Sequence, residues 1–140
     1  MPHISTFIYC EGFQMDNPQM GQQPKLHIVG PMHVLTPQFV PTTFSFGVFF
    51  GILDFNMGEE HKVRVTFLSP QVEDKLLLDT GDIVLPPNKI NADQDMQGFM
   101  MNFDLRNIVI EYNGEYKSEI YLDGEKIGIY PIKVKGMNVK

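Results

Sequence analysis

The chain has 140 residues, a formal net charge of −6 and 43% hydrophobic residues. This length predicts a single domain over residues 1–140, and the hydrophobic share is large enough for a core, which excludes wholesale disorder. The acidic balance argues against a general nucleic-acid-binding protein, and no apolar run approaches the roughly 20 residues of a membrane span.

Alternation of apolar side chains with a period of two runs through most of the chain, beginning with short strands at residues 3–10 and 26–29. Residues 44–53 are apolar on one face and small or apolar on the other, which is typical of a central strand covered on both sides. Residues 61–68 alternate apolar with mostly polar side chains and predict a half-buried strand. We expect one shared core for the inward side chains of these strands and of residues 116–122, namely Phe46, Val48, Phe50, Val63, Val65, Phe67, Ile120 and Leu122.

Turn signals and further short strands fill the second half of the chain. Asn113–Gly114 and Asp123–Gly124 are strong hairpin signals because Asn, Asp and Gly tolerate positive φ, and residues 56–59 indicate another hairpin loop. A change of phase at Tyr130–Pro131 predicts a bulge or an edge position. Additional alternating segments lie at residues 83–85, 99–105, 115–123 and 127–134.

Together these segments predict an all-β fold, an antiparallel β-sandwich of about eight strands with immunoglobulin-like or jelly-roll-like topology. A single helical turn near residues 92–97 is the one helical alternative, because Met96 and the apolar residues after it have helical spacing. Residues 14–24 and 86–97 lack periodicity and predict long surface loops, which in a compact domain are often functional.

Asp79-Thr80-Gly81, preceded by three leucines, is similar to the active-site turn of aspartic proteases. That chemistry needs one carboxylate from each of two such turns, sharing a proton around a water, so this enzyme would have to be a dimer. Asp82 follows, where the family usually has a small residue, and it would add an uncompensated charge. A β-turn that begins at Asp79 is the simpler interpretation, so Asp79 is kept as a candidate and no catalytic residue is predicted.

The spacing of metal-ligating residues predicts no metal and no cofactor. The four histidines and the single cysteine, Cys10, lack zinc spacing, and Cys10 lies in an apolar stretch typical of a buried thiol. Asn91, Asp93 and Asp95 resemble the start of a calcium loop, but the Gly and Glu that an EF-hand needs are missing, which excludes an EF-hand. A solvated acidic loop is the simpler interpretation, and a calcium site of another kind built from this loop is the alternative.

We expect a protein partner to contact the two irregular segments, residues 14–24 and 86–97, together with the adjoining sheet edge. The acidic second segment favours a basic partner, and pairing of two copies through a sheet edge is a further expectation. The candidate partner-binding residues are Asp93, Asp95, Met96, Met15 and Met20.

Three residues of the C-terminal third are assigned structural roles. Gly114-x-Tyr116 resembles the entry into a late strand of immunoglobulin-like sandwiches, in which the tyrosine hydroxyl bonds to an upstream backbone group. Gly124 is assigned to the turn that it forms with Asp123.

Several local patterns occur together along nearly the whole chain. They are the early strand Ile4–Cys10, Leu26-x-Ile28-x-Gly30, Phe39-x-Pro41 leading into Phe44–Phe50, Gly114-x-Tyr116 with Leu122-Asp123-Gly124, and Pro131–Val134. In this combination the chain resembles an uncharacterised family of small bacterial and phage β-sandwich proteins. The resemblance implies a sandwich and points weakly to a mobile or phage-like element. That family has no assigned activity, so the resemblance carries over no functional residues.

No convergent set of acid, base and nucleophile is found in the sequence, so we predict a non-enzymatic protein that acts by protein–protein interaction. One alternative is an acidic inhibitor, encoded by a phage or mobile element, that docks on a host or defence protein. A second is a dimeric aspartic-protease-like enzyme that uses Asp79. The single cysteine and the lack of any Asn-x-Ser/Thr acceptor predict a cytoplasmic location, that of the host cell if the protein is phage-encoded.

Overall fold

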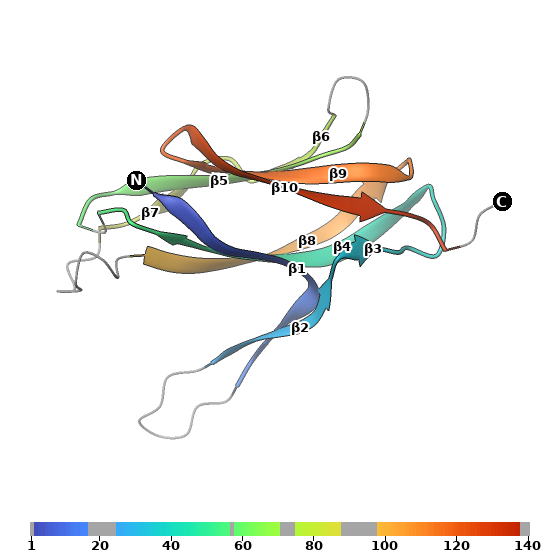
Figure 1. Cartoon of the computed structure of the whole chain (residues 1–140), viewed down its shortest axis with the longest axis horizontal. Helices are drawn as coiled ribbons and strands as arrows, with labels where there is room; N and C mark the ends of the chain where they lie inside the picture. Colours follow the sequence, from blue (N-terminus) through green and yellow to red (C-terminus); the bar gives the residue numbers. More distant parts are fainter. Residues whose placement is uncertain (1, 17–24, 57, 71–74, 88–97, 138–140) are drawn as a thin grey trace.

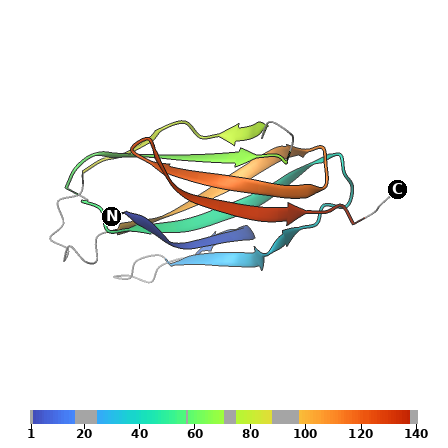
Figure 2. The same cartoon turned by 45° about the horizontal axis from the view of Figure 1, so that its top comes forward.

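The computed structural model is an all-β sandwich of two sheets, seen as stacked layers in Figures 1 and 2. It describes residues 2–16, 25–56, 58–70, 75–87 and 98–137. The first sheet has the order β2-β1-β4-β8, with β1 (His3–Met15), β2 (Leu26–Met32), β4 (Thr42–Leu53) and β8 (Gly98–Ile110). The second has the order β3-β10-β9-β5-β6, with β3 (Val34–Leu35), β5 (His61–Leu68), β6 (Leu76–Asp79), β9 (Gly114–Leu122) and β10 (Glu125–Val134), and β7 (Ile83–Leu85) also pairs with β5.

The predicted sandwich is confirmed, and the described residues form ten strands in place of the expected eight or so. The two additional strands are β3, which has only two residues, and β6. All neighbouring strands are antiparallel except β3 and β10, which run parallel. The described part of the chain holds no helix, so none there is long and apolar enough to cross a membrane. The alternative helical turn near residues 92–97 falls outside the described residues.

The core lies between the two sheets and contains all eight side chains that the alternation predicted to point inward. Each of the eight is at most 4% exposed, which confirms the register of β4, β5 and β9. Phe46 of β4 and Phe67 of β5 join the layers through rings whose centroids are 5.1 Å apart. Burial of these large side chains supplies the main driving force for packing the sheets together.

Of the three expected hairpins, the one at Asp123–Gly124 is confirmed. Both residues have positive φ, 52° and 83°, and Leu122 pairs with Glu125 across them, as a two-residue hairpin requires. The other two expected hairpins are wrong. Residues 56–59 connect β4 to β5 and Asn113–Gly114 connect β8 to β9, and in each case the two strands belong to different sheets. These turns carry the chain from one layer to the other, which their local residue types do not reveal.

The expected irregularity in the last strand is displaced along the chain. The register of β10 against β9 shifts between Lys126 and Gly128, not at Tyr130–Pro131. Tyr130 therefore points inward and stacks on Phe7 of β1, with ring centroids 4.1 Å apart.

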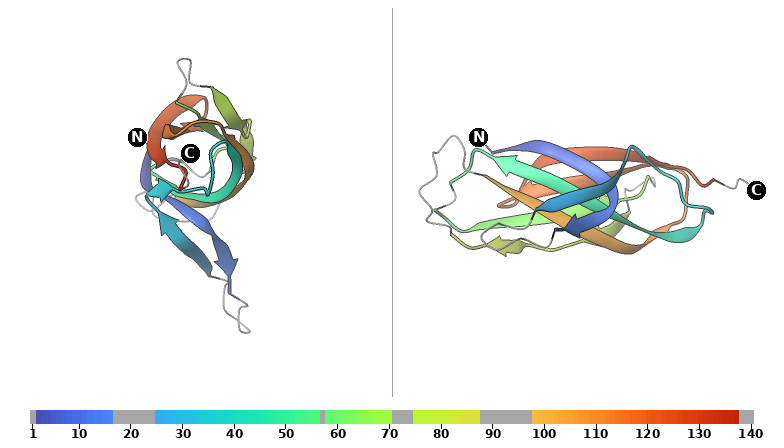
Figure 3. Two further views of the ribbon diagram at one scale, coloured as in Figure 1. Left: turned by 90° about the vertical axis from the view of Figure 1, so that its right-hand side faces the viewer. Right: turned by 90° about the horizontal axis from the view of Figure 1, so that it is seen from below.

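The ends of β1 and β2 that meet residues 17–24 extend away from the sandwich as a two-stranded ribbon, which the left view of Figure 3 shows clearly. We call Gly12–Met15 of β1 and Leu26–Val29 of β2 the arm. β1 pairs with β4 as far as Cys10, opposite Gly47, and beyond that point it pairs only with β2.

Candidate functional site

The arm is amphipathic because of its register. Phe13 lies opposite Ile28 and Met15 opposite Leu26, so these four apolar side chains share one face of the ribbon. The other face carries Gln14 and His27, with Val29 nearer the sandwich, and His27 Nε2 lies 2.7 Å from Asp16 Oδ2.

Most of the apolar face of the arm extends beyond the sandwich. The Phe13 ring reaches back to β4, where any Cβ on Gly47 would lie only 2.7 Å from it, so Gly47 makes room for this contact. Farther out, Met15 is 58% exposed. An isolated two-stranded hairpin is marginally stable in water, so covering this face would stabilise the arm.

Within the described part of the chain, the arm also has an open backbone edge, because β2 is the outermost strand of its sheet. The amide of Asp16 donates to the carbonyl of Lys25 over 3.1 Å, which fixes this pair as a hydrogen-bonded one. Hydrogen-bonded pairs alternate along an antiparallel ribbon, so the N–H and C=O groups of His27 face β1. Those of Leu26 and Ile28 consequently face away from β1, and such groups form a template for an additional strand.

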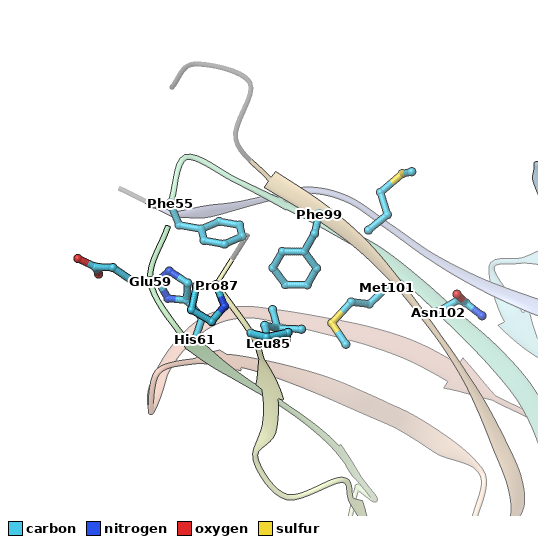
Figure 4. Close-up of a pocket in the computed structure, with 10 residues that line it drawn as sticks. Phe55, Glu59, His61, Leu85, Pro87, Phe99, Met101 and Asn102 are labelled. Atoms are coloured by element: carbon cyan, nitrogen blue, oxygen red, sulfur yellow. The ribbon is translucent and has the colours of Figure 1, made fainter. Parts of the chain in front are cut away.

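A pocket of about 570 Å³ lies at one end of the sandwich, where the β4–β5 connection, the end of β7 and the start of β8 come together. Figure 4 shows the rings of Phe55 and Phe99 facing it, with Leu85 beneath them. Pro86, Pro87 and Met101 add apolar surface, so the pocket is suited to apolar groups. Residues 88–97, which connect β7 to β8, lie outside the described residues.

His61 in the wall of this pocket has acceptors on both ring nitrogens. Nδ1 lies 2.7 Å from Asp123 Oδ2, and Nε2 lies 2.5 Å from the carbonyl oxygen of Asn56. Both nitrogens can donate at once only in the imidazolium form. Burial lowers the pKa of His61, but the hydrogen bonds to Asp123 and Asn56 raise it by more, so the pKa lies above its ordinary 6.5. Both polar atoms of this ring are therefore committed to structural contacts.

We expect the stabilising effect of His61 to depend on pH. A raised pKa in the folded state stabilises the fold below the ordinary value of 6.5, and this contribution is lost as pH rises through the folded pKa. At about pH 6 the wild type should therefore have a higher free energy of unfolding than His61→Gln. This difference should be smaller at about pH 9. Urea unfolding followed by circular dichroism would measure the difference in free energy of unfolding at each pH. The same difference at both pH values would contradict the imidazolium form of His61 in the folded protein.

Asp79 ends β6 and forms a turn with Gly81. One carboxylate oxygen accepts from the amide of Gly81 at 2.8 Å and from Arg64 Nε at 2.8 Å, and the other accepts from Arg64 Nη2 at 2.5 Å. The Arg64 guanidinium, with help from the Gly81 amide, lowers the pKa of Asp79 to about 2. An aspartic protease needs a proton shared between two carboxylates, whereas Asp79 is held ionised by its own arginine.

The remaining predicted residues lie in different parts of the fold. Tyr116 is fully buried and donates its hydroxyl to the carbonyl of Tyr112 over 2.7 Å, at the crossing from β8 to β9. Gly114, with φ of 147°, begins β9 beside that crossing, and Gly124 lies in the β9–β10 turn. Met15 is on the arm, whereas the other candidate partner-binding residues, Met20, Asp93, Asp95 and Met96, fall outside the described residues. The described residues contain no cluster of three His, Cys, Asp or Glu side chains that could hold a metal ion.

Comparison with known proteins gives a family match and several structural likenesses. A family model described as "Family of unknown function (DUF6941)" matches residues 15–135. No curated protein matches the chain by sequence.

The structural likenesses are to parts of larger proteins. One is the Pseudomonas fluorescens alkylpurine DNA glycosylase AlkC bound to DNA containing an abasic site analog, with 9% identity and a TM-score of 0.50 over 74% of this chain and 28% of that chain. Another is a β-glucosidase from Listeria innocua in complex with glucose, with 11% identity and a TM-score of 0.45 over 74% of this chain and 15% of that chain. The chain thus spans less than a third of the glycosylase, and at such low identity that likeness concerns the fold alone.

Proposed function

The chain belongs to DUF6941, a family of unknown function, and from that premise we propose that it is a non-enzymatic protein-binding module that acts through its arm. The observation that carries the proposal is the coincidence of two features on the same strands. The arm presents an exposed apolar face at Met15, and β2 ends its sheet with the backbone groups of Leu26 and Ile28 directed outward.

The mode of binding that suits such a site is strand addition. An extended partner segment would form backbone hydrogen bonds with Leu26 and Ile28, and its alternate side chains would pack beside the apolar face of the arm. Backbone pairing supplies affinity, and the side chains that lie next to Leu26 and Ile28 supply selectivity. Ordering the arm against a partner would also offset the marginal stability of a two-stranded ribbon.

The non-enzymatic part of the proposal is supported by how the acid–base groups are used. Asp79 and His61 are the groups that chemistry would recruit first, because their protonation is biased by specific partners. Arg64 holds Asp79, and Asp123 and Asn56 hold both nitrogens of His61. Neither group keeps a free polar atom directed toward a substrate-sized pocket, which is also why we do not favour the protease alternative.

Two narrower proposals follow from composition. The net charge of −6 supports an acidic inhibitor, because such a protein would be steered toward a basic surface on its target. A cytoplasmic location is supported by Cys10, the single cysteine of the chain, which is fully buried and free.

We expect Ile28→Pro to abolish partner binding while the sandwich stays folded. Proline removes the N–H of residue 28, which faces away from β1, so the pairing of β1 with β2 is preserved and only strand addition is blocked. The matched control is Ile28→Val, which keeps both the N–H and a β-branched side chain. The full chain would serve as bait in a cell extract, with quantitative mass spectrometry of the proteins that each variant retains.

A protein that the wild type and Ile28→Val retain, and that Ile28→Pro does not, would support the arm as the binding site. Amide hydrogen exchange of the purified complex should then be slowed at Leu26 and Ile28. A partner that binds all three proteins equally and leaves this exchange unchanged would place the interface elsewhere.

A further inference from the structure

We propose that the strand added to the arm is β2 of a second copy of this chain, paired antiparallel around a two-fold axis that passes beside His27. This proposal rests on the proposed function, because it names the partner of the same site. It would convert two marginal two-stranded ribbons into one ribbon of four strands.

The backbone of β2 specifies how such a pair would form. The outward-facing groups belong to Leu26 and Ile28, which lie one residue to either side of His27. Antiparallel pairing centred on His27 therefore sets Leu26 of each copy opposite Ile28 of the other, and both pairs are hydrogen-bonded. The residue at the centre, His27, faces its own symmetry mate as a non-hydrogen-bonded pair.

The side chains on the apolar face are self-complementary in this register. Leu26 packs beside Ile28 of the second copy, so the apolar face of one arm continues into that of the other. Met15 and Phe13 flank the joined strands on β1, which makes a contiguous apolar surface that runs across both copies. A two-fold contact requires a patch that matches itself, and this face meets that condition.

The polar face is compatible with the same arrangement. His27 of one copy would lie opposite His27 of the other, but each imidazole is already paired with its own Asp16 at 2.7 Å. Each imidazole therefore has an acidic neighbour within its own copy and needs no contact with the other ring.

The β2 edge also lacks the usual protection against pairing. Natural sheet edges are blocked by proline, by bulges or by charged residues that point toward the partner strand. In β2 the irregular positions are Gly30, with φ of 63°, and Pro31, and both lie at the root of the arm. The stretch Leu26–Ile28 itself contains no such block, and the nearest charged residues are Lys25, directly before Leu26, and Asp16, directly after β1.

The register can be tested by a disulfide at the two-fold axis. In a non-hydrogen-bonded antiparallel pair the Cα atoms are about 4.5 Å apart, which a disulfide can span. We therefore expect His27→Cys to form a covalent dimer under mild oxidation. The matched control is Gln14→Cys, opposite His27 on the same polar face but on β1, where three strand spacings, about 14 Å, would separate it from its mate. The native Cys10 is fully buried and should not compete.

The expected result is a disulfide dimer of His27→Cys that is at least tenfold more abundant than that of Gln14→Cys. Adding Ile28→Pro to His27→Cys should remove this preference. Sedimentation equilibrium of the wild type should show a mass that rises toward the dimer with concentration, and Ile28→Pro should stay a monomer.

The proposal that the partner is a second copy would be wrong if the wild type remained a monomer at every concentration. It would also be wrong if both cysteine variants cross-linked equally. If such a monomer still captured another protein and lost it on Ile28→Pro, the proposed function would survive and only the identity of the partner would change. If Ile28→Pro altered neither dimerisation nor capture, both proposals would fail.

Discussion

Replacing Phe50 with alanine is expected to lower the free energy of unfolding by about 3–5 kcal/mol, the cost typical of removing a buried phenylalanine. Phe50 is a fully buried residue of β4. Its ring is stacked between Phe7 of β1, at 6.4 Å, and Phe103 of β8, at 5.9 Å, so the change leaves a cavity shared by three neighbouring strands. A domain of this size is usually stable by only about 5–15 kcal/mol, so the loss would be a large fraction of the total.

The control for this prediction is Phe39→Ala. Phe39 is 53% exposed, so the same atoms are removed from a position where they contribute little to the core. We expect a cost of about 1 kcal/mol or less there. Far-UV circular dichroism in urea is the suitable measurement, since the chain has no tryptophan to report unfolding by fluorescence. Equal costs for the two variants would contradict the inward register of β4.

The register of single strands could be predicted from the sequence because alternation is a local property. Side chains in a strand point to opposite faces in turn, so the spacing of Phe46, Phe50 and Phe67 was enough to direct them inward. The same parity places His61 on the face of Val63 and Val65, a signal that could have predicted its burial.

The pairing of strands is harder to predict from the sequence, because it depends on contacts between residues that are far apart in the chain. Turn residues at Asn113–Gly114 indicate that the chain reverses, but not whether the next strand stays in the same sheet. β3 is a second example: Val34 and Leu35 form a strand only because β10 lies beside them. Two residues have no periodicity to detect.

The candidate site shows the same division between local and distant information. The sequence predicts Met15 as a partner-binding residue but Leu26 and Ile28 only as strand residues, because nothing local shows that β1 and β2 extend past the sandwich. Likewise Phe55, Leu85 and Phe99 come from separate elements and form a pocket only through the tertiary fold. The arm therefore had to be recognised from the topology.

Tyr9 connects β1 to the second sheet just before β1 leaves β4, and Tyr9→Phe is expected to lower the free energy of unfolding by about 1–3 kcal/mol. The Tyr9 hydroxyl lies 2.6 Å from the carbonyl oxygen of Tyr130 and 2.8 Å from Ser118 Oγ. A carbonyl can only accept, so the tyrosine donates to Tyr130 and accepts from Ser118. These two bonds connect β1 of one sheet to β9 and β10 of the other, and burial of the hydroxyl group raises the pKa of Tyr9.

The cost arises because the partners stay buried after the hydroxyl is removed. Ser118 is fully buried, so in Tyr9→Phe its own hydroxyl would have to find another acceptor or remain unpaired. Adding Ser118→Ala should therefore cost less in the Tyr9→Phe background than in the wild type, which a double-mutant cycle measures. Tyr112→Phe is the control: it removes a hydroxyl from a 52% exposed side chain and should change stability by no more than about 0.5 kcal/mol.

The position of Tyr9 links this stability effect to the proposed function. Tyr9 pairs with Val48 of β4 on one side and Met32 of β2 on the other, so it lies where the arm leaves the sandwich. Losing its bonds to the second sheet should loosen the root of the arm more than the core. We therefore expect amide exchange in Tyr9→Phe to accelerate first in β1 and β2. Uniform acceleration through both sheets would show that Tyr9 stabilises the sandwich as a whole and has no special role in holding the arm.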